Sequence, residues 1–241
     1  GPTCCSWFES SGSQRHRRGE PPFSWPPAGA DHRPGRSPRR HGAMTTPPSL
    51  ADLRRRLRAA RAALPARARR EAARQVARHL RRLPAFRAAR HVAGYLAVRG
   101  ELDPAPALAL ARARGARVYL PVVRGPRLWF ARHEPGDDLR RGHYGIPVPA
   151  RAARVRPGAL QVVLMPVVAV DATGNRVGSG GGYYDRSFAR RLAPRHARRP
   201  LLIGIAYDFQ RVDALAPRPH DVAVDIVVTP GGVSTRASRL R

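Results

Sequence analysis

Lysine is absent from this 241-residue sequence, so arginine supplies all 45 of its basic residues. Asp and Glu number only 16, which leaves a formal net charge of +29. A nucleic-acid-binding protein would gather such charge in a patch with interleaved aromatic rings. Here the arginines are spread over most of the chain, and only 6% of residues are aromatic. We therefore interpret the charge as a coding bias, although non-specific attraction to polyanions is expected in any case.

Cysteine and long apolar runs are also scarce. Cys4 and Cys5 are the only cysteines, so neither a disulfide framework nor a Cys-based zinc site is possible. The longest apolar stretch, Leu160 to Val170, is far shorter than the roughly 20 residues of a membrane-spanning helix. We expect a cytoplasmic protein with no membrane partner.

Composition divides the chain into three parts. Residues 1–43 are rich in Pro, Arg, Gly and Ser, have no helical or strand periodicity, and are predicted to be a disordered N-terminal extension. Residues 44–233 carry the regular patterning and are predicted to form one catalytic domain. Residues 234–241 are predicted to be a flexible tail. The hydrophobic content of 42% is enough for a packed core.

Apolar spacing predicts alternating helices and strands. Ser49 and Asp52 resemble a capping box at the start of a first helix, in which leucines recur every three or four residues. The other predicted helices are Ala66–Leu83, Pro104–Arg114 and Tyr184–Leu192. The predicted strands are His91–Val98, Arg117–Val123, Arg127–Ala131, Leu160–Val170 with a break near Pro166, Leu201–Tyr207 and Ala223–Thr229. This alternation predicts an α/β fold with a largely parallel sheet covered on both faces.

A glycine-rich segment, Asp171 to Asp185, separates a predicted buried strand from a predicted helix. Glycines let the backbone turn sharply and bring amide groups close to phosphate oxygens. The segment lacks the Gly-Lys-Ser/Thr ending of a Walker loop, and Tyr183 stands where G-x-G-x-x-G requires glycine. We predict a phosphate cradle of another kind. A flexible surface loop is the alternative, which Arg176 before the glycines and Tyr-Tyr-Asp after them disfavour.

The run from Arg176 to Asp185 resembles the ATP-binding signature of 5-formyltetrahydrofolate cyclo-ligases, also called methenyltetrahydrofolate synthetases. Further motifs follow that family's order, namely Arg99–Asp103, Tyr144–Pro149, Ile203–Gln210 and His220–Thr229. The resemblance extends over about residues 49–230, and several ordered motifs leave little room for chance agreement.

This resemblance implies a Rossmann-like three-layer sandwich with a mostly parallel sheet, similar to sugar-phosphate isomerases and CoA transferases. It implies a monomeric, Mg-ATP-dependent enzyme without a specific nucleic-acid partner. Its substrate would be 5-formyltetrahydrofolate, with or without a polyglutamate tail, and its products 5,10-methenyltetrahydrofolate, ADP and phosphate. ATP would phosphorylate the formyl oxygen, and N10 would then attack the activated carbon. The protein would mainly position the reactants and offset charge on the moving phosphoryl group.

The resemblance also assigns residues to ATP. Arg176 would donate to phosphate oxygens and is, with Tyr183, a candidate catalytic residue. Arg54 matches a family position that reaches ATP, but it is equally one solvated arginine among many. Many relatives have lysine where this chain has Leu50. The full set of ATP-binding candidates is Arg54, Arg176, Gly178, Ser179, Gly180, Gly181, Gly182, Tyr183 and Tyr184.

Two aspartates are candidate magnesium ligands. Asp185 follows the glycines directly, and magnesium prefers a few carboxylates together with water and phosphate oxygens. The alternative role of Asp185 is to complement the dipole of the helix in whose first turn it lies. Asp225 lies among Val and Ile of a predicted strand, where a buried carboxylate needs a partner. That partner is either the metal ion or an arginine.

Four residues are folate candidates by the same resemblance. Glu101 can accept hydrogen bonds from the donor edge of the pterin. Leu96 and Tyr144 would line the ring pocket, with ordinary core packing as the alternative for both. Gln210 would add a polar contact, unless it is a turn residue.

Two other functions remain open. An arginine-rich RNA-binding protein would bind with a steep salt dependence and turn over no nucleotide. A sugar-phosphate isomerase of similar fold would need no ATP, and the Tyr183–Asp185 run would have no evident use in it.

Overall fold

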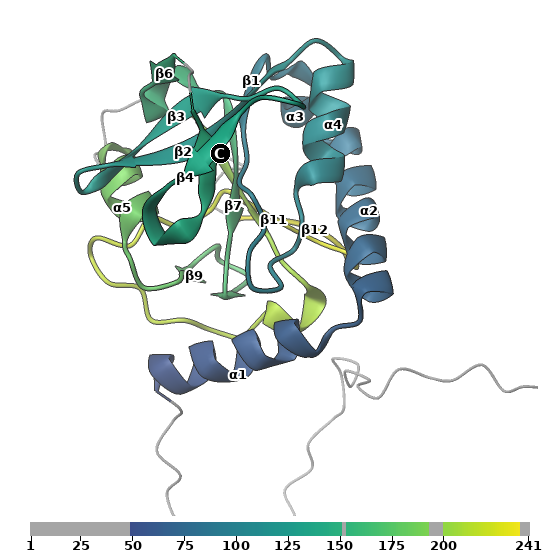
Figure 1. Ribbon diagram of the computed structural model, residues 1–241. Helices are drawn as coiled ribbons and strands as arrows, with labels where there is room; N and C mark the ends of the chain where they lie inside the picture. Colours follow the sequence, from purple (N-terminus) through teal and green to yellow (C-terminus); the bar gives the residue numbers. More distant parts are fainter. Residues whose placement is uncertain (1–48, 151–152, 193–199, 237–241) are drawn as a thin grey trace, which may run out of the picture. The chain divides into compact units, whose positions relative to one another are not determined.

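The computed structural model describes residues 49–150, 153–192 and 200–236 (Figure 1). The predicted N-terminal extension, residues 1–43, lies outside the described residues, as does the chain after residue 236. The α-helices in these ranges are α1 (Leu50–Ala63), α2 (Ala66–Arg82), α3 (Pro84–Ala88), α4 (Ala105–Ala113) and α5 (Tyr183–Phe188). Short 3-10 helices lie at His143–Gly145, Pro157–Ala159, Ala189–Leu192 and Asp208–Gln210.

An eight-stranded sheet forms the centre of the fold, in the order β12-β11-β10-β7-β1-β2-β3-β6. The inner strands β11, β10, β7, β1 and β2 are mutually parallel, and β12, β3 and β6 join the edges antiparallel. The strands are β1 (His91–Ala93), β2 (Arg117–Arg124), β3 (Arg127–Arg132), β6 (Arg154–Val155), β7 (Val162–Pro166), β10 (Leu201–Ile205), β11 (Ile226–Thr229) and β12 (Gly232–Thr235). Two separate hairpins pair β4 (Leu139–Arg141) with β5 (Pro147–Pro149) and β8 (Ala169–Val170) with β9 (Arg176–Val177).

Helices cover both faces of the sheet, which confirms the predicted three-layer α/β fold. In Figure 1, α2, α3 and α4 lie to the right of the sheet and α5 to its left. Alternate residues of β7 pack on opposite sides, because successive strand side chains point to opposite faces. Val162 and Leu164 join the cluster with α2 and α4, whereas Val163 and Met165 join the cluster that includes Phe188 of α5.

The first two helices form where the apolar spacing predicted them. Ser49 caps α1, since its hydroxyl accepts a hydrogen bond from the Asp52 N–H at 3.1 Å. Pro65 follows the end of α1 and cannot continue a helix. On α2, residues four apart, Ala72, Val76 and Leu80, are buried in the core. Within the described ranges, no helix is both long and apolar enough to span a membrane.

Two strand boundaries differ from expectation and one agrees with it. β1 ends at Ala93, not at Val98, and Gly94 directly after it lies tightly against Leu108. The predicted break near Pro166 is present, since β7 ends there and β8 begins at Ala169. β12 extends to Thr235 and pairs with β11, so the first residues of the predicted flexible tail belong to the sheet. Their edge pairing satisfies backbone groups that a tail would expose.

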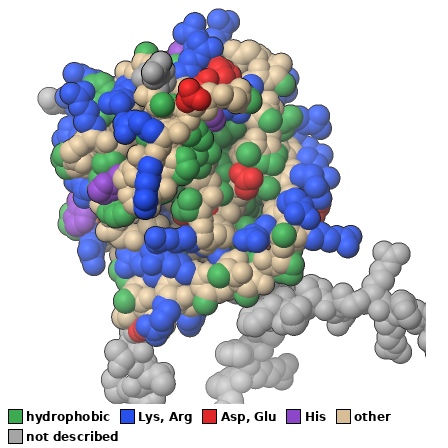
Figure 2. Space-filling model, in the orientation of Figure 1, with side chains coloured by type: hydrophobic (Ala, Val, Ile, Leu, Met, Phe, Trp, Pro, Cys, Tyr) green, Lys and Arg blue, Asp and Glu red, His purple; other side chains and the backbone are tan. Residues whose placement is uncertain are grey.

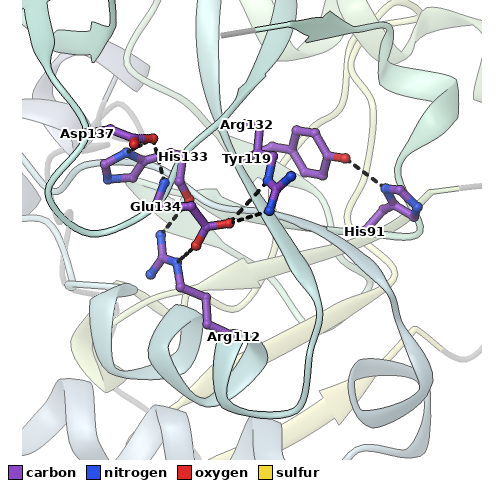
Figure 3. A network of polar contacts seen from close by, with 7 residues as sticks. All are labelled: His91, Arg112, Tyr119, Arg132, His133, Glu134 and Asp137. Atoms are coloured by element: carbon purple, nitrogen blue, oxygen red, sulfur yellow. Dashed lines mark hydrogen bonds and ion pairs between the residues drawn. The ribbon is translucent and has the colours of Figure 1, made fainter.

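A polar network lies over α4 and the edge of the sheet (Figure 3). Glu134 pairs with Arg112 of α4 at 3.6 Å and with Arg132 of β3 at 3.0 Å. His91 and Tyr119 connect β1 to β2 through a 2.9 Å hydrogen bond. The network therefore holds α4 against the sheet, and none of its residues lines the cavity described next.

Candidate active site

A cavity of about 1120 Å³ opens beside the carboxyl ends of the central strands. Pro166 at the end of β7 lines it, as do Tyr95 and Leu96 just after β1. β1 has β7 on one side and β2 on the other, so the sheet is built outward in both directions from this point. Ligands of open parallel sheets bind at such a switch point. Figure 2 shows hydrophobic side chains on this face with arginines around them.

The glycine-rich loop, residues 178–182, forms one wall of the cavity. Gly180 and Gly182 have φ values of +102° and +63°, a backbone region that favours glycine. A Cβ at Gly182 would also lie 2.6 Å from Nη1 of Arg186. Within the described residues, no backbone N–H of the loop donates a hydrogen bond to protein. The loop therefore has amide donors available for an anion, as the sequence predicted.

Arginines bind the carbonyl oxygens of the same loop. Arg54 of α1 donates from Nε to the Gly178 carbonyl at 3.0 Å. Arg58, one turn later, donates to the Ser179 carbonyl at 3.0 Å. Arg186 of α5 donates to the Gly181 carbonyl at 2.7 Å. The structure thus brings Arg54 to the predicted ATP site from far away in the sequence, and it adds two arginines that the sequence analysis did not single out.

Arg176 and Asp185 form an ion pair at the base of the loop. Their Nη2 and Oδ1 atoms are 2.6 Å apart, and the side chains are 4% and 17% exposed. The same Oδ1 accepts a hydrogen bond from the Val222 N–H at 3.1 Å. Among the described residues, Nε of Arg176 is buried and has no hydrogen-bond partner. The ion pair therefore fixes the Arg176 guanidinium at the base of the loop through its Nη2 atom.

The two metal candidates lie in different places. Asp185 borders the cavity, and in the described part of the chain its Oδ2 accepts no hydrogen bond. Asp225 is not among the residues that line the cavity. Both of its oxygens lie 2.7 Å from Nη2 of Arg191, and Oδ2 also accepts from the Leu202 N–H. The prediction that Asp225 holds the metal is therefore replaced by the arginine pairing that the sequence left open. Among the described residues, no cluster of three or more His, Cys, Asp or Glu side chains forms a metal site.

Asp171 shapes the hairpin that leads into the loop, and the sequence analysis gave it no role. Its carboxylate accepts hydrogen bonds from Thr173, from Asn175 and from the Leu215 N–H. Burial opposes ionisation of Asp171, but these hydrogen bonds outweigh it and hold the pKa below its usual value. The signal in the sequence was the turn Asp-Ala-Thr-Gly-Asn, in which an aspartate accepts from the residues that follow it.

Three of the four folate candidates, Leu96, Glu101 and Tyr144, also line the cavity. Burial raises the pKa of Glu101, which accepts a 3.3 Å hydrogen bond from the Val98 N–H. Nearby Arg61, Arg58 and Arg99 oppose that rise. These three residues thus add one carboxylate acceptor, an apolar side chain and an aromatic ring to the cavity lining.

Three aromatic rings cluster beside the glycine-rich loop. The Tyr183 hydroxyl and Nε2 of His143 form a 3.0 Å hydrogen bond, with the proton position depending on the imidazole tautomer. Tyr144 packs edge-on against both rings, and its own ring is 67% exposed. Its φ of +57° is uncommon for a residue with a side chain and marks local strain. Tyr184 also lines the cavity, where its ring stacks on Phe188 and burial raises the pKa of its hydroxyl.

Gln210 does not line the cavity, so it is not placed to contact folate. Its side chain is 1% exposed, donates to the carbonyls of Val167 and Val168, and accepts from the Tyr207 N–H. These bonds use both ends of the amide. The alternative interpretation, in which Gln210 is a turn residue, therefore fits the structure, because the side chain satisfies backbone groups where β7 and β10 end.

The comparisons with known proteins agree with the predicted resemblance. Residues 48–230 match the 5-formyltetrahydrofolate cyclo-ligase family. The chain is 34% identical over 168 residues to 5-formyltetrahydrofolate cyclo-ligase of Escherichia coli K12, covering 68% of this chain and 90% of that protein. For the enzyme of that name from Haemophilus influenzae, the identity is 31% over 182 residues, covering 73% and 95%. The NMR structure of Aquifex aeolicus 5,10-methenyltetrahydrofolate synthetase superposes with a TM-score of 0.67 at 32% identity, covering 78% of this chain and 92% of that one. With its fold, its glycine-rich loop and these relatives in agreement, the chain belongs to the 5-formyltetrahydrofolate cyclo-ligase family.

Proposed function

We propose that this protein converts 5-formyltetrahydrofolate to 5,10-methenyltetrahydrofolate, coupled to conversion of ATP to ADP and phosphate. One observation carries the proposal. The glycine-rich loop and Arg176 line the same cavity as Leu96, Glu101 and Tyr144. The lining therefore combines donors suited to phosphate with a carboxylate and apolar side chains, as two different ligands would require.

The glycine-rich loop fits a triphosphate. The cavity lining offers the amide donors of Gly178–Gly182 and the guanidinium of Arg176. Backbone amides and a fixed guanidinium are strong donors to phosphate oxygens. Arg54 uses Nε for the Gly178 carbonyl, which leaves its other two nitrogens to reach a phosphate. In this site ATP supplies the phosphoryl group that makes the formyl oxygen a leaving group, and Mg²⁺ offsets the charge of the phosphates.

Asp185 is the residue that fits the magnesium ion. Magnesium in nucleotide sites is commonly held by one or two carboxylates, with waters and phosphate oxygens completing the octahedron. Oδ1 of Asp185 accepts hydrogen bonds from Arg176 and from the Val222 N–H. Among the described residues, Oδ2 accepts none, so it is available to a cation in the cavity. Asp185 therefore has two roles in the proposal, since it orients Arg176 through one oxygen and meets the cation through the other.

Leu96, Glu101 and Tyr144 fit the pterin. Glu101 would accept hydrogen bonds from the ring's N–H donors, while Leu96 and Tyr144 would contact its faces. The Tyr183 to His143 hydrogen bond joins the glycine-rich loop to the segment that carries Tyr144, because Tyr183 follows the loop and His143 precedes Tyr144. Holding both reactants in one cavity converts a bimolecular encounter into a reaction of neighbouring groups.

A direct assay tests the proposal. The purified full chain is mixed with 5-formyltetrahydrofolate, ATP and Mg²⁺, and the near-ultraviolet absorbance of the methenyl product is followed together with ADP release. We expect product and ADP in equal amounts, and no product when either ATP or Mg²⁺ is omitted. If no product forms while ATP stays intact, the proposed activity is wrong.

A further inference from the structure

Arg58 and Arg186 approach the glycine-rich loop from opposite sides and bind it in the same way. Arg58 comes from α1 and donates to the Ser179 carbonyl at 3.0 Å. Arg186 comes from α5 and donates to the Gly181 carbonyl at 2.7 Å. Both contact backbone oxygens of the loop, and each donor is charged, which strengthens the hydrogen bond.

Arg186 is itself held in place by two further contacts. Its Nε donates to the Pro126 carbonyl, in the turn between β2 and β3, at 2.6 Å. Its guanidinium lies 5.0 Å from the centre of the Tyr183 ring, a cation–π distance. The loop is therefore connected through Arg186 to the sheet edge, and through Arg58 to α1.

Because of peptide geometry, each held carbonyl also fixes the direction of the N–H group in the same peptide unit. A trans peptide is planar, and its C=O and following N–H point in opposite directions. When Arg58 holds the Ser179 carbonyl, the Gly180 N–H points away from Arg58. When Arg186 holds the Gly181 carbonyl, the Gly182 N–H points away from Arg186. An anion bound by these two amides thus lies on the face of each peptide opposite to the arginine.

We propose that Arg58 and Arg186 are positioning residues that hold the loop by its carbonyls, so that the Gly180 and Gly182 amides are oriented before the anion arrives. This inference rests on the proposed function of the loop as the ATP phosphate site. Neither arginine touches phosphate in this role. Their effect is preorganisation, because a loop of four glycines would otherwise lose much backbone entropy on binding.

The test uses Arg58→Leu and Arg186→Leu in the full chain, each with a matched control. Arg56→Leu removes the same charge from an exposed position of α1, and Arg190→Leu does so just after α5. In the described residues, neither Arg56 nor Arg190 contacts the loop. Thermal melting confirms that all four variants fold. Backbone ¹⁵N relaxation then measures the order of the loop amides in ligand-free protein, and kinetics give KM for ATP.

We expect the order parameters of the Gly180 and Gly182 amides to fall from about 0.85 to below about 0.6 in both test variants. KM for ATP should rise about tenfold in each, as the loss of one such hydrogen bond predicts. KM for the folate and both control variants should stay near wild type.

Two results would overturn the inference. If KM for ATP rises while the loop amides of the ligand-free variants stay ordered, the arginines are phosphate ligands. If neither quantity changes, the contacts have no role in binding. The relaxation measurement needs no turnover, so a wild-type protein that is inactive would refute the proposed function without deciding the order of the loop.

Discussion

Two aspartates, Asp185 and Asp225, each pair with an arginine, and only one pair borders the cavity. Arg176 and Asp185 are 2.6 Å apart, and Asp185 lines the cavity. Arg191 and Asp225 are 2.7 Å apart, with side chains 9% and 8% exposed, away from the lining. The residue types and distances are nearly the same. The comparison shows that pairing with an arginine does not by itself reveal whether an aspartate borders a ligand site.

The partners around each pair explain the difference in role. Asp225 has both oxygens on Arg191 and also receives the Leu202 N–H, so it satisfies groups inside the fold. Among the described residues, only Oδ1 of Asp185 accepts hydrogen bonds, and Oδ2 accepts none. Asp185 therefore keeps a carboxylate oxygen for the proposed metal ion.

Asp185→Asn should have the largest effect on catalysis. The substitution weakens the pairing that orients Arg176 and removes the charge available to the cation. We expect kcat/KM to fall by about 10³-fold, comparable to loss of a strong electrostatic contact in an active site. The measurement is the methenyl assay over a range of Mg²⁺ concentrations. Activity near wild type at ordinary Mg²⁺ would contradict the metal role of Asp185.

Asp225→Asn should instead affect stability. Removing one charge of a buried ion pair costs about 3 kcal/mol of unfolding free energy. We expect a lower urea midpoint, with kcat/KM close to wild type at a temperature where the variant is folded. A large loss of Mg²⁺-dependent activity in the folded variant would show that Asp225 is a magnesium ligand. The two aspartates would then not differ in role.

Gln210→Leu extends the comparison to an uncharged group. The substitution leaves the carbonyls of Val167 and Val168 and the Tyr207 N–H without their partner. We expect a loss of about 2 kcal/mol in unfolding free energy. KM for the folate should not change, and a clear rise in it would show that Gln210 contacts the substrate after all.

Glu101→Gln should give a smaller change, specific to the folate. We expect KM for 5-formyltetrahydrofolate to rise about tenfold, as for the loss of one good hydrogen bond. Burial places the pKa of Glu101 above its usual 4.5, so the carboxylate is lost as pH falls through that raised value. Wild-type kcat/KM for the folate should therefore decline on the acid side, and the Gln variant should lack this decline. An unchanged pH profile would exclude an ionised Glu101 from binding.

Much of the fold followed from local patterns. The apolar spacing of α1 and α2, the Ser49 cap and the break at Pro166 depend on neighbouring residues, so they were predictable. The end of β1 was not, because the apolar pattern continues to Val98 although β1 ends at Ala93. The pairing of β12 was missed for a similar reason, since an edge strand gains its hydrogen bonds from a neighbour and not from its own pattern.

The sequence by itself determined the family, the α/β architecture and the glycine-rich loop, because each depends on residues close together in the chain or on motifs in order. Only the tertiary structure decided which aspartate borders the cavity, and that Gln210 belongs to the core. It also decided that Arg54, Arg58 and Arg186 meet the loop. These outcomes depend on contacts between segments far apart in sequence, and among 45 arginines no local pattern distinguishes those that reach a site from those that face water.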